Sequence, residues 1–315
     1  MKRVFRIFIS FLLLVVFAIV SFLVYHYHSD LPISVLKEKY ANPYSKFVEV
    51  NGMDVHYQRK GKGHPFVLIH GFSGHVHNWR EWMEHLANDF DLIAMDLPGF
   101  GLTGPHIDRD YSMKSNIAFL DQFLSKIGVD TFYLAGNSMG GGIAWSYALA
   151  RPDKVKKLVL VDASGYPRKS SKSIAGFELL EYRFLHPLIT KITPEFIIKQ
   201  SLEGTYVNQN YASDKEVELY MDMLRRKGNR QVLIDKMTQG VRKDRSAEIK
   251  QIKTPTLIIW GDKDNLISVE NAYKFEQDIP SSSLIVYPDI GHIPMDEAGK
   301  QSAKDVRTYL LGSAL

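Results

Sequence analysis

The sequence of 315 residues contains no cysteine. This absence excludes a disulfide framework, a thiolate metal site and a cysteine nucleophile. No glycine-rich phosphate loop of the Rossmann or Walker type follows any predicted strand, so no nucleotide cofactor is expected. Long blocks of one charge sign are also missing: the formal net charge is +4, but Lys and Arg are scattered among Asp and Glu. A nucleic-acid partner is therefore not indicated.

The remaining composition is that of a folded protein with an ordinary core. Apolar residues make up 45% of the chain and charged residues 23%. A chain of this length fits one α/β domain with an insertion, because single α/β domains of about 200 to 250 residues are common. No internal repeat and no low-complexity segment interrupts it.

The amino terminus carries a long apolar run, residues 7–25, in which only two serines are polar. Roughly 20 residues of helix cross a hydrocarbon core, so the run is long enough to span a membrane. Basic residues precede it, which predicts a cytoplasmic amino terminus and an outward-facing remainder (Lys2, Arg3 and Arg6). A cleaved signal peptide is the alternative, but the run is long for one and no small-x-small site follows Val24. We predict a retained anchor over residues 1–28.

A polar tether is expected over residues 29–46, which include Pro32 and Pro43. Two short alternating runs follow, at 47–50 and 53–59, and Asn51-Gly52 between them favours a tight hairpin turn. These runs are predicted to be antiparallel edge strands.

Beyond the hairpin, short apolar runs alternate with amphipathic helical patterns, which predicts an α/β fold with a mostly parallel sheet and helices on both faces. The predicted strands lie at 66–69, 92–95, 132–135, 158–161, 257–260 and 284–287. Between 165 and 245 the pattern is helical only, at 177–184, 194–202, 215–226 and 231–241. The sequence therefore predicts a core at 47–164 and 246–315, with a helical lid at 165–245 over the carboxyl ends of the strands.

The sharpest local pattern is Gly136-Asn137-Ser138-Met139-Gly140, between a predicted strand and a predicted helix. Glycines two residues before and after Ser138 lack a Cβ and relieve the crowding of a sharp turn. The turn would hold the Ser138 hydroxyl near a helix amino terminus, whose dipole favours negative charge. Taken alone, the pattern is also compatible with a glycine-rich turn that contains an ordinary serine.

Four further motifs follow predicted strands: Ile69-His70-Gly71-Phe72-Ser73-Gly74, Asp96-Leu97-Pro98-Gly99-Phe100-Gly101, Gly261-Asp262-Lys263-Asp264 and Gly291-His292-Ile293-Pro294. With the Ser138 turn, their order and spacing resemble the α/β-hydrolase fold family over about residues 47–315.

The resemblance implies roles for five residues. Ser138 would attack a carbonyl carbon, His292 would take its proton, and Asp264 would orient the imidazole. The chain order serine, acid, histidine is the order found in this family. The backbone amides of Phe72 and Met139 would form the oxyanion hole.

Several residues compete for these roles or suggest others. Asp162 is the rival acid, because it ends the strand at 158–161 and some family members place their acid there. His70, beside the oxyanion loop, is interpreted as a residue that orients the loop. His75 and His77 are spaced like metal ligands, but no carboxylate motif accompanies them, so no metal site is expected. Two aspartates are interpreted as structural, one capping a turn and one tying a loop (Asp262 and Asp96).

The serine at the turn distinguishes the chain from haloalkane dehalogenases and epoxide hydrolases, which carry an aspartate there. The simplest hypothesis is hydrolysis of esters with apolar or lipid-like acyl groups. Apolar lid residues favour such groups, although they could equally form the core of the lid (Tyr166, Phe177, Leu179, Leu180, Phe184 and Phe196).

Three alternatives remain. The Ser138 turn is similar to that of carbon–carbon hydrolases of ring-cleavage products, but those enzymes typically carry a tryptophan soon after the histidine. This chain has Ile293-Pro294-Met295 instead. A slow ligand sensor on the same fold and an acyltransferase are the other two. The expected partners are a small ester or lipid substrate and the membrane.

Overall fold

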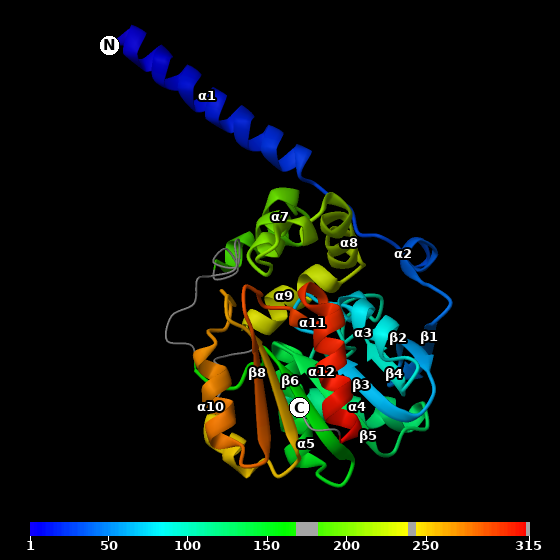
Figure 1. Ribbon diagram of the computed structural model, residues 1–315. Helices are drawn as coiled ribbons and strands as arrows, with labels where there is room; N and C mark the ends of the chain where they lie inside the picture. Colours follow the sequence, from blue (N-terminus) through cyan, green and yellow to red (C-terminus); the bar gives the residue numbers. More distant parts are fainter. Residues whose placement is uncertain (168–181, 239–243, 313–315) are drawn as a thin grey trace.

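The computed structural model describes residues 1–167, 182–238 and 244–312. An eight-stranded sheet with the order β1-β2-β4-β3-β5-β6-β7-β8 forms its centre (Figure 1). The strands are β1 (Ser45–Val50), β2 (Met53–Gly61), β3 (His64–Ile69), β4 (Phe90–Met95), β5 (Phe132–Asn137), β6 (Val155–Val161), β7 (Thr256–Gly261) and β8 (Ser282–Tyr287). The predicted α/β class and all of the predicted strands are confirmed.

The first two strands form the predicted hairpin. Asn51 and Gly52 at its turn have φ values of 50° and 76°, the left-handed conformation that a tight two-residue turn requires. The prediction that both strands lie at the edge is wrong for β2, which also pairs antiparallel with β4. Strands β3 to β8 pair in parallel. The carboxyl ends of these six strands therefore meet at one edge of the sheet.

Helices cover both faces of the sheet, and each face has its own apolar core. In β3, Val67 and Ile69 pack into one core, whereas Phe66 and Leu68 pack into the other. This alternation explains why the strand is apolar along its whole length. The covering helices are α3 (Arg80–His85), α4 (Met113–Lys126), α5 (Met139–Ala150), α10 (Glu270–Asp278), α11 (Pro294–Glu297) and α12 (Gly299–Leu311).

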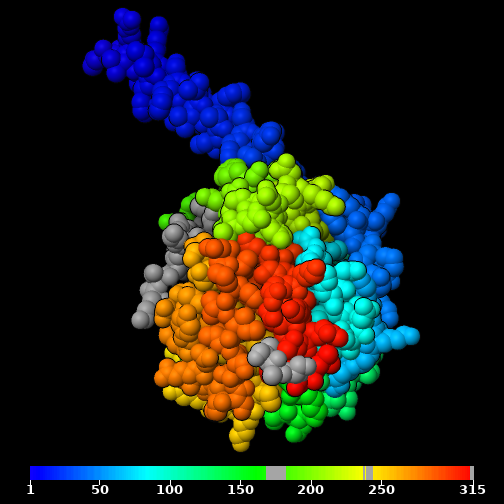
Figure 2. All heavy atoms as spheres, viewed as in Figure 1, coloured from blue at the N-terminus to red at the C-terminus, as the bar shows by residue number. Residues whose placement is uncertain are grey.

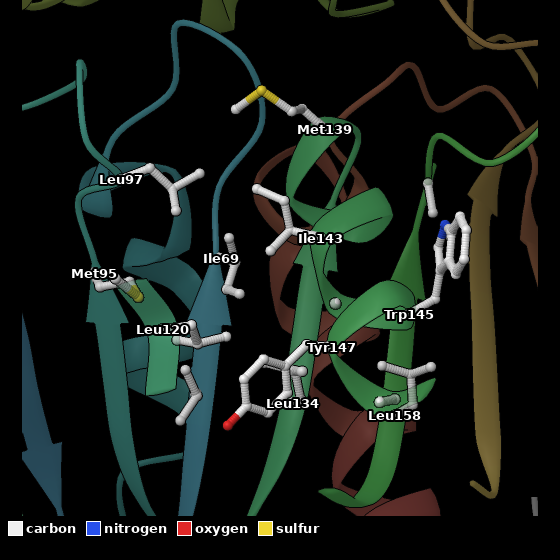
Figure 3. Close-up of a cluster of buried hydrophobic side chains, with 14 of the residues drawn as sticks. Ile69, Met95, Leu97, Leu120, Leu134, Met139, Ile143, Trp145, Tyr147 and Leu158 are labelled. Atoms are coloured by element: carbon white, nitrogen blue, oxygen red, sulfur yellow. The ribbon is translucent and has the colours of Figure 1, made fainter. Parts of the chain in front are cut away.

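Helix α5 is nearly enclosed and holds the segment that follows β5. Ile143 and Trp145 leave it on opposite sides, Ile143 toward Ile69 and Leu97 (Figure 3). The Trp145 indole N–H donates a 2.9 Å hydrogen bond to the Ser164 carbonyl. With both flanks packed, α5 gives the residue at its amino terminus a fixed position.

Between β6 and β7 the described residues contain helices and no strand: α6 (His186–Ile189), α7 (Glu195–Glu203), α8 (Asp214–Arg225) and α9 (Asn229–Thr238). We call residues 165–245 the lid. Helices α7, α8 and α9 occupy three of the predicted helical ranges and lie above the carboxyl ends of the strands (Figure 1). The fourth prediction, 177–184, falls mostly outside the described residues.

A cluster of ion pairs and hydrogen bonds connects the lid to the core. Arg80 of α3 donates to Glu216 of α8 at 2.8 Å and to Asp296 of α11 at 3.2 Å. The Tyr206 hydroxyl donates to Asp296 at 2.8 Å. Because Glu216 and Asp296 are buried, removal of the Arg80 charge would leave two carboxylates without their partner.

Helix α1 (Lys2–Tyr25) stands away from the rest of the molecule (Figure 1). It has 24 residues, an 18-residue stretch with a mean hydropathy of 3.2, and no buried residue. By length and composition it can cross a membrane.

The expected tether at 29–46 is more ordered than the sequence indicated. It contains helix α2 (Ile33–Tyr40), whose Leu36 is fully buried beside Leu219 and Met223 of α8. A single buried residue gives no helical periodicity, and for that reason the pattern did not reveal the helix. Isolated bridges also join Tyr27 to Ile192 and Leu31 to Arg226.

Candidate active site

Ser138 lies at a strained turn between β5 and α5. Its φ of 54° and ψ of −118° are uncommon for a residue with a side chain. A Cβ on Gly136 would lie 2.3 Å from the Gly140 carbonyl oxygen, and one on Gly140 would lie 2.3 Å from the Ile69 carbonyl oxygen. Both positions therefore require glycine, as the sequence pattern predicted. The turn places Ser138 directly before the amino terminus of α5.

His292 and Asp264 meet although 28 residues separate them. The His292 Nδ1–H donates to Asp264 Oδ2 at 2.7 Å. The other carboxylate oxygen of Asp264 accepts the backbone amides of Leu266 at 2.7 Å and Ile267 at 3.0 Å. These bonds fix both the carboxylate and the histidine tautomer, leaving Nε2 as the ring nitrogen that can accept a proton.

Asp162, the rival acid, lies beside the pair. Its carboxyl oxygen, one from Asp264 and one ring nitrogen of His292 all lie within 4.8 Å of one another. Asp162 is fully buried and accepts the Gly261 amide at 3.2 Å. Burial, and then the nearby Asp264 carboxylate, raise the pKa of Asp162 well above its ordinary value. A raised pKa favours the neutral form of Asp162.

The loop after β3 lies against the Ser138 turn. A Cβ on Gly71 would lie 3.1 Å from the Ser138 Cβ, so Gly71 packs closely against the serine. Phe72 is the next residue along this loop. His70 Nδ1–H donates to the Gly71 carbonyl at 2.7 Å, and its Nε2 accepts the Leu97 amide at 3.0 Å. Burial lowers the pKa of His70, which favours this neutral form. Both nitrogens are engaged with backbone, as expected of a residue that orients the loop. Met139 is the first residue of α5.

Two residues that contribute to this arrangement were missed in the sequence. The Asn137 side-chain amide donates to the His292 carbonyl at 3.0 Å and to the Val161 carbonyl at 3.2 Å. The His292 amide donates to the Thr205 carbonyl at 2.8 Å. Asn137 lies within the Gly136-Asn137-Ser138-Met139-Gly140 motif, but it was assigned no role from the sequence. The Thr205 contact uses a backbone carbonyl, which every residue has, so no sequence pattern could indicate it.

The other predicted residues lie outside this group. Asp96 accepts the amides of Val76 and Leu102 at 2.8 Å each, which fits the loop-tying role. Asp262 accepts the Asp289 amide at 2.7 Å. Neither His75 nor His77 joins a set of three possible metal ligands in the part of the chain that the structure describes; the one such set there is Asp162, Asp264 and His292.

The apolar lid residues divide into three groups. Tyr166 is partly buried against Phe275, at 4.9 Å between ring centroids. Phe184 and Phe196 are exposed, so the alternative that they form the core of the lid is wrong for both. The remaining three lie outside the described residues (Phe177, Leu179 and Leu180).

Comparison with known proteins identifies the family of the chain. The model of the alpha/beta hydrolase fold family matches residues 64–299, so the chain belongs to this family. It is 30% identical over 261 residues to Lipase 1 of Psychrobacter immobilis, covering 78% of this chain and 77% of that protein.

A second relative is 2-hydroxy-6-oxo-6-(2'-aminophenyl)hexa-2,4-dienoic acid hydrolase of Metapseudomonas resinovorans, at 27% identity over 87% of this chain and 94% of that protein. Among solved structures, a membrane phospholipase A described as a bacterial virulence factor aligns over 99% of both chains, with 26% identity and a TM-score of 0.71. The protein is therefore a hydrolase with lipases among its relatives.

Proposed function

We propose that the protein cleaves carboxylic esters with apolar or lipid-like acyl groups through an acyl-enzyme on Ser138. The observation that carries this proposal is the 2.7 Å hydrogen bond between Asp264 and His292 beside the strained Ser138 turn. A serine hydroxyl is a weak nucleophile unless a base removes its proton. The similarity to Lipase 1 and to the membrane phospholipase A favours esters with apolar acyl groups.

In the proposed reaction the Ser138 oxygen attacks the ester carbonyl carbon while His292 Nε2 accepts the hydroxyl proton. Asp264 stabilises the resulting imidazolium without taking its proton. The amides of Phe72 and Met139 donate to the oxyanion of the tetrahedral intermediate. His292 then protonates the leaving alcohol as the carbon–oxygen bond breaks. Water, deprotonated by His292, then attacks the acyl carbon; the bond to the Ser138 oxygen breaks, His292 returns its proton to that oxygen, and the carboxylic acid is released.

A carbon–carbon hydrolase of ring-cleavage products is the second candidate. It is supported by the similarity to the dienoic acid hydrolase of Metapseudomonas resinovorans. The sequence after His292, Ile293-Pro294-Met295, lacks the tryptophan typical of such enzymes. We therefore rank this activity below ester hydrolysis.

A panel of substrates separates the candidates. We expect turnover of p-nitrophenyl esters across a chain-length series, with little or none on a 2-hydroxy-6-oxo-dienoate. Preference for the dienoate would favour the carbon–carbon hydrolase. Tight binding of an ester with negligible turnover would favour a ligand sensor, and acyl transfer to an added alcohol in preference to water would favour an acyltransferase.

We further propose that α1 is a retained membrane anchor and that the hydrolase domain lies on the outer side of the cytoplasmic membrane. Residues 1–28 would form the anchor and 47–164 with 246–315 the hydrolase core. The basic residues at the start of α1 support this orientation, because positive charge favours the cytoplasmic side (Lys2, Arg3 and Arg6).

A further inference from the structure

The outer end of α1 fixes where the membrane surface lies on the molecule. Its 24 residues extend about 36 Å, and a bilayer hydrocarbon core is about 30 Å thick. With Lys2 at the cytoplasmic surface, Tyr25 lies at the opposite one. Tyr25 and Tyr27 are 80% and 55% exposed, and tyrosine is enriched at membrane interfaces.

The lid is bonded directly to the residues that follow α1. The His28 amide donates to the Lys191 carbonyl at 2.9 Å, and the Thr193 amide donates to the His26 carbonyl at 3.1 Å. Arg230 of α9 reaches the same segment, donating to the His28 carbonyl at 2.8 Å. Figure 2 shows lid atoms directly at the end of α1. If α1 crosses the membrane, the lid lies at the level where the chain leaves it.

The lid residues around this junction combine exposed apolar and basic side chains. Phe184, Leu188 and Phe196 are 76%, 42% and 55% exposed, and the Phe196 ring lies 5.9 Å from that of His26. Isolated exposed apolar residues are ordinary in soluble proteins, but these three lie within 13 positions of one another on the segment bonded to α1. Three basic residues and one acid, Glu195, accompany them (Arg183, Lys191 and Lys199). Lys191 and Lys199 also pair with acids outside this range, Asp30 at 3.5 Å and Asp214 at 3.4 Å.

We infer that the surface of residues 182–200, the lid face, lies in the headgroup region of the bilayer that α1 crosses, and that the active site takes its ester substrates from this bilayer. The inference rests on the proposed ester hydrolysis and on α1 as an anchor. The occupant of the lid face is the outer leaflet: apolar side chains enter its acyl boundary, and basic side chains meet its phosphates.

One helix connects the lid face with the catalytic histidine. Phe196 lies in the first turn of α7, and the chain leaves the other end of this helix at Thr205, whose carbonyl accepts the His292 amide. Nine residues of helix extend about 14 Å. About one length of α7 therefore separates the lid face from the backbone of His292.

The absence of cysteine allows a direct test of depth. The full-length variants Phe184→Cys and Phe196→Cys, labelled with an environment-sensitive fluorophore, are reconstituted into vesicles of phosphatidylethanolamine with a minority of phosphatidylglycerol. We expect quenching by lipids that carry a nitroxide near the headgroup. The matched control is Tyr273→Cys on α10, an exposed aromatic position away from α1 for which we expect no quenching. Equal quenching at all three positions would overturn the inference. Absence of quenching at Phe184→Cys and Phe196→Cys, the result expected if a second copy of the chain covers the lid face, would also overturn it.

Activity provides the second test. In the same vesicles, Phe184→Ser/Phe196→Ser should lower turnover of an embedded lipid ester on the order of tenfold, because apolar contact with the bilayer is lost. Turnover of a soluble short-chain ester should stay unchanged, and Tyr273→Ser should affect neither substrate. An unchanged rate on the lipid ester would contradict the inference while leaving ester hydrolysis intact. Absence of soluble-ester turnover in the unmodified protein would instead contradict the proposed function.

Discussion

Two aspartates lie close to His292, and their hydrogen bonds differ. Asp264 accepts two backbone amides and the His292 Nδ1–H. Asp162 is fully buried, and burial followed by the nearby Asp264 carboxylate raises its pKa well above the ordinary value, although its one backbone donor, the Gly261 amide, acts in the opposite direction. The proposed orienting acid is therefore Asp264, while Asp162 fills the space behind it without adding a second negative charge.

Substitution of these aspartates tests the division of roles. Asp264→Asn should lower turnover by about 10⁴-fold, because the amide no longer holds the productive histidine tautomer. Asp162→Asn should stay within about tenfold of the unmodified protein, because an amide replaces a neutral acid of the same shape. Steady-state kinetics on a soluble ester, with circular dichroism as a control for folding, measures both. An active Asp264→Asn beside a folded but inactive Asp162→Asn would reverse the assignment.

At the residue scale the sequence was informative where chemistry restricts the residue type. Ser138, His292 and Asp264 stand in short motifs with glycine at fixed offsets, and the structure brings His292 and Asp264 together as expected. Thr205 could not be found, because any residue supplies a backbone carbonyl. That contact exists only through the fold of the lid.

At the scale of the elements, steric constraint dominates the turn around Ser138. Gly136→Ala should abolish activity and lower the unfolding midpoint, because its Cβ would meet the Gly140 backbone at 2.3 Å and cannot be accommodated by side-chain movement. Thermal unfolding and ester turnover measure the effect.

The control for this prediction is Gly128→Ala. Gly128 has a φ of 69°, but a Cβ at this position would have no atom within 4 Å of it. The substitution should cost about 1 kcal/mol of stability through backbone strain alone and leave turnover unchanged. Gly136 itself has no positive φ, so equal effects of the two substitutions would contradict the close approach as the cause of its requirement for glycine.

Element prediction succeeded or failed according to how many residues of an element are buried. Strands β3 to β7 are largely buried, so their apolar runs were unambiguous, whereas the edge strand β8 has one buried residue and was found from its apolar run alone. Helix α2 contributes only Leu36 to the core and gave no pattern. The interior place of β2 was missed because sheet order depends on pairing with β4, which its own sequence does not encode.

For the molecule as a whole, buried histidines link stability to pH. Burial is the main cause that lowers the pKa of His75 well below its usual range and that of His77 to about 4. In the unfolded chain these two histidines bind protons near pH 6.5, whereas in the folded protein they bind them only at lower pH. The free energy of unfolding should therefore fall as pH drops from 6.5 toward 4.

His77→Phe tests this link, because a phenyl ring retains the shape and cannot titrate. Each pKa unit corresponds to about 1.4 kcal/mol, so the variant should recover about 3 kcal/mol of the loss at pH 4. Denaturant unfolding in detergent across pH measures it, and at about pH 8 the advantage should be absent. Identical pH slopes for both proteins would contradict a proton-linked role for His77.

The orientation across the membrane can be tested because the chain has no cysteine. Lys304→Cys places one thiol on the exposed surface of α12. A membrane-impermeant maleimide should label this variant in cells whose cytoplasmic membrane is intact and whose outer barriers are permeable. Labelling only after lysis of the cytoplasmic membrane would place the hydrolase domain inside.

The central claim is that Ser138 carries the acyl group, and covalent labelling tests it most directly. A fluorophosphonate, whose phosphoryl centre resembles the tetrahedral intermediate, should modify the protein at one site, which peptide mass spectrometry assigns to Ser138, with loss of esterase activity. Ser138→Ala should lose both labelling and turnover while its unfolding midpoint changes by only a few degrees, because one hydroxyl contributes little to stability. A folded Ser138→Ala protein that hydrolyses esters at the unmodified rate would contradict the account.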